Sequence, residues 1–157
     1  MISCAADLER VGKLKQILTK FVRLPSGRAP TVCTIDDVGM RPERYEAILN
    51  ESMCKVILAS DNTMKDSADE WLKVHPSLWT LVQKRDKYVI AVKMQKCVKL
   101  PDALKGYTPL EINRILRGRL LDEVDIDMLG EKDLDGYIMM TITNLLEECE
   151  KEVGDNI

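Results

Sequence analysis

Apolar residues recur at three- and four-residue steps near both ends of the chain. Over residues 5–22 the stripe consists of Leu8, Val11, Leu14, Leu18, Phe21 and Val22. Over residues 137–152 it consists of Ile138, Ile142, Leu145, Leu146 and Cys149. This spacing places the apolar side chains on one face of a helix. The pattern therefore predicts an amphipathic helix over each of these two ranges.

Short apolar runs between them predict strands. The runs are TVCTI (31–35), CKVILAS (54–60), LWTLVQ (78–83) and YVIAVKM (88–94). They are β-branched or continuously apolar, which is typical of strands with buried faces. The charged KRDK between the last two has the length of a hairpin connection. We therefore expect a parallel strand–helix–strand unit followed by an antiparallel hairpin.

Helix-start signals lie between these runs. Pro42 opens a predicted helix over 41–52, and Thr63 caps another that starts at Met64. In the stretch Thr108-Pro109-Leu110-Glu111, the spacing of threonine and glutamate is that of a capping box. It predicts a helix that starts after Thr108 and ends near Gly118. The predicted fold is a mixed α/β or α+β single domain over 1–157, with about four strands covered by four to five helices.

The composition is that of an ordinary globular protein. Of the 157 residues 45% are hydrophobic and 31% are charged. No apolar run approaches the roughly 20 residues of a membrane-spanning helix, and the first residues lack the apolar centre of a signal peptide. We expect an intracellular, cytoplasmic protein with no membrane partner. The five cysteines form no C-x-x-C pair and there is one histidine, so no metal site and no cofactor is predicted.

The net charge of −3 conceals a strong asymmetry. Residues 1–119 form a basic body with 21 lysines and arginines against 14 acids, a net charge of +7. Residues 120–157 form an acidic, helical C-terminal segment with 2 against 12, a net charge of −10. Two explanations stay open. The regions pair with each other in the fold, or they serve charge-complementary partners.

The leading functional hypothesis is a small non-enzymatic interaction or regulatory protein that acts through a basic surface. Nucleic acid is one candidate partner, because phosphate contacts need cations on one surface rather than a strict motif. The candidate contact residues are Arg10, Lys13, Lys20, Lys84, Arg85, Lys87, Lys93, Arg114 and Arg117. The acidic segment either binds a basic protein or lies over the basic surface. Self-association is a further alternative.

An enzyme is the alternative class. Asp37 and Asp61 follow the first two predicted strands, and ligands of open α/β sheets bind beyond such strand ends. These aspartates would act with a divalent metal, although aspartates are also ordinary turn residues. Asp125 and Asp127 do not start an EF-hand loop, because Leu129 and Gly136 occupy positions that need oxygen ligands. The sequence contains no glycine-rich phosphate loop.

Tyr107-Thr108 and the following INRILRG (112–118) resemble a short signature of bacterial and phage-type mono-ADP-ribosyltransferases. The resemblance covers about 30 residues, with DLDGYI (133–138) similar to the element that follows, and it implies a partial transferase-like domain of viral or phage type. The chain departs from the family in spacing. It also has no Ser-Thr-Ser after Gly118, and its Glu-x-Glu at 148–150 falls within a predicted helix. No catalytic residue is carried over.

Overall fold

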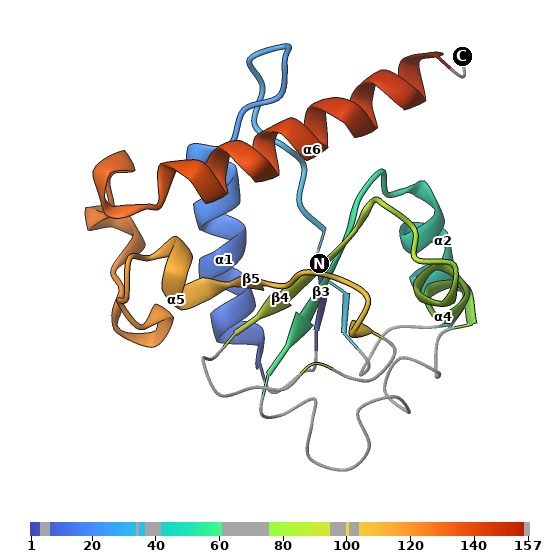
Figure 1. Ribbon diagram of the computed structural model, residues 1–157, viewed down its shortest axis with the longest axis horizontal. Coiled ribbons are helices and arrows are strands. Elements are labelled where there is room, and N and C mark those ends of the chain that lie inside the picture. Colours follow the sequence, from blue (N-terminus) through green and yellow to red (C-terminus); the bar gives the residue numbers. More distant parts are fainter. Residues whose placement is uncertain are drawn as a thin grey trace.

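The protein folds as a parallel β-sheet with helices on both sides (Figure 1). The computed structural model describes residues 1–3, 7–33, 35–36, 42–60, 76–94, 100 and 104–155. Helices α1 (Leu8–Phe21) and α5 (Ile112–Ile115) lie on one side of the strands. Helices α2 (Pro42–Glu51) and α4 (Pro76–Gln83) lie on the other. This layering confirms a mixed helix-and-strand class.

The sheet has the spatial strand order β2-β1-β3-β4-β5, and all neighbouring strands run parallel. The strands are β1 (Ile2–Ser3), β2 (Ile35–Asp36), β3 (Lys55–Ala59), β4 (Val89–Lys93) and β5 (Leu110–Glu111). Only β3 and β4 are five residues long, and they pair from Lys55 opposite Val89 to Ala59 opposite Lys93. The other three strands have two residues each. This order defines a doubly wound arrangement.

Successive side chains of β3 and β4 point to opposite faces of the sheet and enter two separate cores. Leu58 and Val92 join the core formed with α1, α5 and the C-terminal part of the chain, which we call the α1 face. Ile57 and Ala91 join the core formed with α2 and α4, which we call the α2 face. Strands buried on both faces read as continuous apolar runs, which is why these two were predictable.

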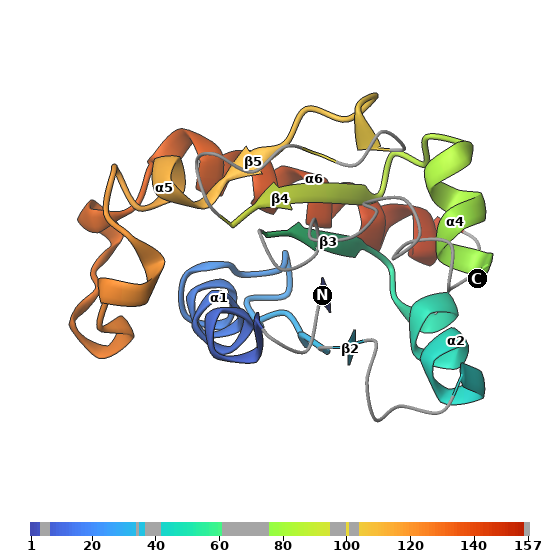
Figure 2. The same cartoon turned by 90° about the horizontal axis from the view of Figure 1, so that it is seen from below.

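Helix α6 (Gly136–Asp155) crosses the end of the sheet where β3 and β4 begin. The Lys87 ammonium, two residues before β4, lies 2.6 Å from the Glu152 carboxylate. Cys54, directly before β3, and Cys149 are neighbours, since each thiol affects the pKa of the other. In Figures 1 and 2 the helix runs from the side of α5 toward the side of α4.

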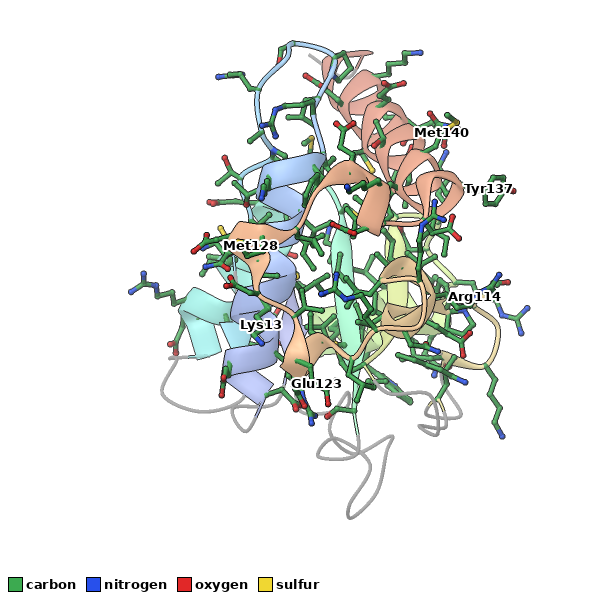
Figure 3. All side chains as sticks on the ribbon, turned by 90° about the vertical axis from the view of Figure 1, so that its left-hand side faces the viewer. Lys13, Arg114, Glu123, Met128, Tyr137 and Met140 are labelled. Atoms are coloured by element: carbon green, nitrogen blue, oxygen red, sulfur yellow. The ribbon has the colours of Figure 1, made fainter. Side chains whose placement is uncertain are left out.

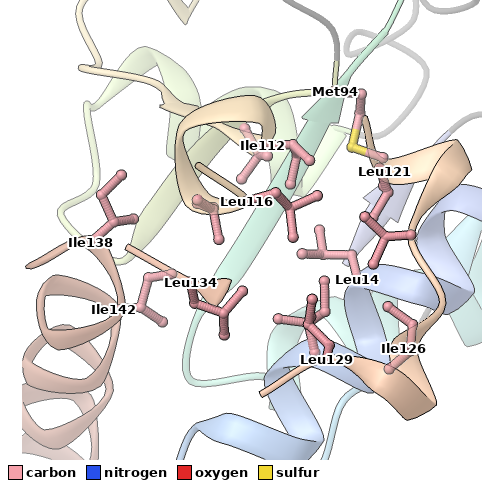
Figure 4. Close-up of a cluster of buried hydrophobic side chains, with 14 of the residues drawn as sticks. Leu14, Met94, Ile112, Leu116, Leu121, Ile126, Leu129, Leu134, Ile138 and Ile142 are labelled. Atoms are coloured by element: carbon pink, nitrogen blue, oxygen red, sulfur yellow. The ribbon is translucent and has the colours of Figure 1, made fainter. Parts of the chain in front are cut away.

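Residues 121–135 form what we call the acidic lobe, which contains seven carboxylates and one lysine. Its backbone makes three short 3-10 turns, Leu121–Glu123, Ile126–Met128 and Glu131–Asp133. The lobe lies along the outer side of α1 (Figure 3). Five of its apolar side chains turn inward and are buried with Leu14 and Leu116 (Figure 4); they are Leu121, Val124, Ile126, Leu129 and Leu134.

Five predicted elements are confirmed with shifted ends. The helices predicted over 5–22, 41–52 and 137–152 are α1, α2 and α6, and the strands predicted over 54–60 and 88–94 are β3 and β4. The strand predicted over 31–35 is wrong over 31–33, which are extended loop, and pairing begins at Ile35. The helix predicted after Thr63 lies outside the described residues.

The predicted hairpin is wrong because residues 78–83 belong to helix α4. Leu78 and Val82 are both 1% exposed and lie four residues apart, on one side of that helix. The KRDK segment then forms a turn from helix to strand, with Arg85 at φ +53°. Strand β4 consequently enters the sheet parallel to β3 rather than antiparallel to a preceding strand.

The helix predicted after Thr108 is also wrong over most of its length. Leu110 and Glu111 pair with Val92 and Lys93 as strand β5, and only Ile112–Ile115 are α-helical. Glu111, not Thr108, precedes the helix, and its side chain makes no capping hydrogen bond. Arg117 at φ +53° and Gly118 at φ +89° then turn the chain away. Sheet pairing therefore replaces the predicted capping box.

Candidate functional site

Two buried polar side chains meet where the strand order reverses between β1 and β3, the position at which doubly wound sheets bind ligands. Asp7, beside the start of α1, is 1% exposed, and Ser60, directly after β3, is 0% exposed. The Ser60 hydroxyl donates to the Asp7 carboxylate at 2.5 Å. Arg10 Nη1 lies 3.3 Å from the other Asp7 oxygen. The buried carboxylate is therefore matched by a hydroxyl and a guanidinium.

The two aspartates predicted for an enzyme, Asp37 and Asp61, follow β2 and β3 in the sequence but lie outside the described residues. Their role stays a prediction. Within the described ranges, no group of three or more histidine, cysteine, aspartate or glutamate side chains is arranged to hold a metal ion.

The basic side chains of α1 bind the acidic lobe. Arg10 donates to both carboxylate oxygens of Asp122, at 3.1 and 3.2 Å. Lys13 donates to the backbone carbonyls of Leu121 and Asp122, at 3.1 and 3.0 Å.

Farther along the helix, Lys20 donates to the carbonyls of Ile126 and Leu129, at 3.1 and 2.8 Å. An irregular segment leaves carbonyls that a regular helix would satisfy, and buried carbonyls need partners. The carbonyls of Leu121 and Ile126 also accept from backbone N–H groups, and the lysines add donors there and at Asp122 and Leu129. Helix α1 therefore presents a row of donors to the lobe.

Two more of the predicted contact residues are engaged within the chain. Arg117 Nε donates to the Leu134 carbonyl at 3.0 Å, which fixes the end of the lobe beside α5. Lys87 pairs with Glu152, and their hydrogen bond raises the pKa of Lys87 and lowers the pKa of Glu152. Internal pairing thus accounts for five of the nine residues predicted to contact a partner: Arg10, Lys13, Lys20, Lys87 and Arg117.

The other four lie at different places on the molecule. Lys84 and Arg85 are exposed in the turn after α4, Lys93 ends β4, and Arg114 is exposed on α5. Helices α4 and α5 lie at opposite ends of the molecule in both Figure 1 and Figure 2. The nine predicted residues therefore do not gather on one surface.

The outer side of the acidic lobe combines carboxylates with an exposed apolar side chain. Glu123, Asp127 and Glu131 are exposed, and none forms an ion pair with another described residue. Met128 is 81% exposed and points outward from the lobe (Figure 3). Charge counting indicated this acidity, but the exposure of Met128 could not be read from the sequence.

A second set of exposed apolar side chains lies at the start of α6. Tyr137 is 81% exposed and Met140 is 63% exposed. Both point away from the protein on the same side as Arg114 (Figure 3). Neither residue belongs to the apolar stripe that contains Ile138 and Ile142. This position outside the stripe predicts from the sequence that both side chains are exposed.

A cavity of about 440 Å³ lies on the α1 face of the sheet. Its walls come from α1, from the sheet, from α6 and from the segments 24–33 and 48–54. Representative wall residues are Leu14 and Leu18 of α1, Val56 and Ile90 of the sheet, and Ile142 and Leu146 of α6. Because segments far apart in the sequence form it, no local sequence pattern indicates the cavity.

The cysteines near the cavity are not set up as nucleophiles. Burial, and to a smaller extent the neighbouring Cys149, raises the pKa of the Cys54 thiol to about 12. Burial also raises the pKa of Cys149. Reactive cysteines have lowered pKa values, since the thiolate is the nucleophile. Cys54 is consequently a neutral, weakly polar part of the wall.

Comparison with models of protein families, with curated proteins and with solved structures finds no match for this chain. The class is therefore defined by the structure alone, as a doubly wound parallel α/β protein with an appended acidic lobe. None of the described helices is long and apolar enough to cross a membrane.

Proposed function

We propose that this protein is a small interaction or regulatory protein whose partner-binding surface is the outer side of the acidic lobe. Its partner would be a protein segment rich in lysine and arginine that also carries an apolar side chain. The observation that carries the proposal is the combination of three unpaired carboxylates, Glu123, Asp127 and Glu131, with the 81% exposed Met128.

The internal contacts of the lobe support this assignment. Lys13 and Lys20 donate to backbone carbonyls rather than to carboxylates, so they fix the lobe without neutralising its outer side chains. A fixed acidic surface attracts cationic partners and favours the correct orientation on encounter. An exposed apolar residue inside a charged rim is the usual arrangement of a binding contact.

The test is a titration of the labelled protein with a basic amphipathic peptide and with an acidic peptide of equal length, at low and physiological salt. The variant Glu123→Gln/Asp127→Asn/Glu131→Gln should weaken binding of the basic peptide about tenfold or more at low salt, because three attractive charges are removed. The control Glu9→Gln/Glu43→Gln/Glu148→Gln makes the same change in net charge at exposed positions elsewhere. Equal binding by the two variants would refute the assignment to the lobe.

The apolar contribution has its own variant. Met128→Ala should weaken the binding of the basic peptide at all salt concentrations, because apolar contacts are not screened by ions. Met140→Ala is the matched control, since Met140 is also exposed but lies on α6.

Nucleic-acid binding remains the second candidate, with the exposed and unpaired Lys84 and Arg85 in the turn after α4 as its contact residues. Fluorescence anisotropy with short labelled DNA and RNA from 50 to 300 mM salt tests it. Phosphate contacts would give affinity that falls steeply with salt. Lys84→Glu/Arg85→Glu should then abolish binding without unfolding the protein, and unchanged binding would remove this turn from the surface.

The enzyme alternative with Asp37 and Asp61 also stays a prediction. A divalent metal that binds only the folded state raises the melting temperature. We therefore expect a shift with Mg²⁺, Mn²⁺ or Ca²⁺ only if this alternative holds, and none if the protein acts through the lobe.

A further inference from the structure

We infer that the cavity on the α1 face is a binding site for a neutral, elongated apolar molecule with one polar end, such as a medium-chain alcohol. This site is separate from the acidic lobe and does not depend on the function proposed for it.

The first support comes from side chains in the middle of the sheet. Val56 on β3 and Ile90 on β4 point to the α1 face but are only partly buried. Their neighbours Ile57 and Ala91, which point to the α2 face, are 0% and 1% exposed. Apolar side chains of central strands are normally covered completely. The α1 face therefore has room beside Val56 and Ile90 that no described side chain fills.

The size of the cavity limits its occupant. An apolar cavity of about 150 Å³ holds one benzene molecule, and this cavity has about three times that volume. Two turns of an α-helix with side chains occupy about 850 Å³, from a length near 11 Å and a diameter near 10 Å. The cavity therefore does not enclose two whole turns of a partner protein's helix. A small organic ligand falls within the usual range of about 300–1,000 Å³.

The walls indicate the chemistry of that ligand. The exposed residues of the lining are Thr31, Cys33, Glu51 and Met53, so the cavity opens between the segments that hold them. Glu51 is the single charged side chain of the lining, and it would repel an anionic head group. The Met1 amino group, also at the wall, already donates to the Cys33 carbonyl at 2.5 Å, and burial lowers its pKa.

The hydroxyl of Ser52 donates to the Ile48 carbonyl at 2.7 Å and leaves its own oxygen as an acceptor near this opening. A ligand hydroxyl can donate to such an oxygen or to the Glu51 carboxylate, while its chain extends between α1 and α6. A neutral donor at one end of an apolar chain therefore fits the wall better than a carboxylate does.

The direct test uses the neutral fluorophore N-phenyl-1-naphthylamine with the full chain. We expect a saturable rise in fluorescence with one binding site per chain. Decanol should displace the probe at a concentration about tenfold or more below that needed for decanoate. An absence of saturable binding would overturn the site, and stronger displacement by decanoate would overturn the neutral ligand class.

Two variants locate the binding. Ile90→Phe and Leu146→Phe each place a larger side chain into the cavity. Each should lower the affinity for the probe about tenfold or more, while the melting temperature stays equal or rises. Met140→Phe makes a comparable change at an exposed position of α6 and should leave binding unchanged. Unchanged binding by the folded cavity variants would overturn the assignment.

Methyl NMR of the unaltered protein gives a readout that does not depend on how the variants fold. Decanol should shift the methyl signals of Val56, Ile90 and Leu146, which line the cavity, and leave those of Met128 and Met140 in place. Shifts confined to the exposed methionines would show surface adsorption and overturn the inference.

Discussion

The two faces of the sheet are covered in different ways. On the α2 face, α2 and α4 pack directly on β3 and β4, and the central side chains Ile57 and Ala91 are completely buried. On the α1 face, the cover is assembled from α1, α5, the acidic lobe and α6, and it encloses a cavity of about 440 Å³. Among the described residues, the first face is covered by two helices and by Leu104 of the segment before β5, whereas the second is covered by segments that polar contacts hold in place.

The difference shows that the two faces of one parallel sheet are stabilised by different kinds of contact. On the α2 face, the described contacts are mainly those of completely buried apolar side chains. The α1 face has the larger apolar cluster and in addition uses Lys13, Lys20 and Arg10 as donors that join α1 to the lobe. It therefore combines apolar packing and polar contacts with the cavity and the acidic lobe.

The largest expected effect compares two isoleucines on the two faces. Ile57→Ala should lower the free energy of unfolding by about 2–5 kcal/mol, because it creates a void in a filled core. Ile90→Ala should lower it by only about 1–2 kcal/mol, since Ile90 already borders the cavity. Equilibrium urea unfolding measures both values. Equal losses would contradict the proposed difference in packing between the faces.

A smaller effect is expected where α1 holds the lobe. Lys20→Met should lower the free energy of unfolding by about 1–2 kcal/mol, because the Leu129 carbonyl loses its donor and the Ile126 carbonyl keeps only the Leu129 N–H. Lys20→Met should also increase the rate of amide hydrogen exchange more in the lobe than in β3. Lys15→Met is the matched control on the exposed side of the same helix, expected to stay within about 0.5 kcal/mol. An equal loss in both variants would argue against the lysine–carbonyl contact.

The smallest expected effect concerns the thiol at the cavity wall. With a pKa of about 12, Cys54 should be alkylated by iodoacetamide at pH 8 about a thousandfold more slowly in the folded protein than in urea. Site-resolved mass spectrometry measures the rate for Cys54 separately from other cysteines. Similar rates in the two states would mean that the wall at Cys54 is open to water.

The same thiol gives a pH dependence with a definite sign. Its pKa is raised in the folded state, so its contribution to stability is complete below the unfolded value of about 8.5 and is lost as the pH rises toward 12. Cys54→Ala should therefore make the stability less dependent on pH between about 9 and 12, as measured by urea unfolding at each pH. An unchanged slope would contradict the raised pKa.

The sequence predicted those elements whose local pattern agrees with their tertiary environment. The stripes of α1 and α6 and the apolar runs of β3 and β4 are of this kind. The strand predicted over 78–83 is wrong because a short apolar run fits a buried strand as well as a helix, whereas Pro76 at the first helical position favours the helix. The helix predicted to start after Thr108 is wrong at its beginning because pairing of Leu110 and Glu111 with β4 outweighs a favourable capping pattern.

The candidate sites were less accessible to prediction. The charge asymmetry left internal pairing and partner binding open, and one internal ion pair, between Arg10 and Asp122, joins the two regions. Lys13 and Lys20, however, bind backbone carbonyls, which no charge count reveals. The cavity results from imperfect fit between segments far apart in the sequence, so only the packed structure shows it.

The contacts between α1 and the lobe also affect the order in which the chain can fold. The donors on α1 and their acceptors are separated by 106 to 112 residues. During synthesis α1 is complete long before residues 121–129 exist, whereas the α2 face needs only residues 45–104. Domains with such distant contacts fold slowly and expose apolar surface meanwhile. We therefore expect the nascent chain to close its α2 face first and to keep the apolar side of α1 uncovered until the lobe emerges.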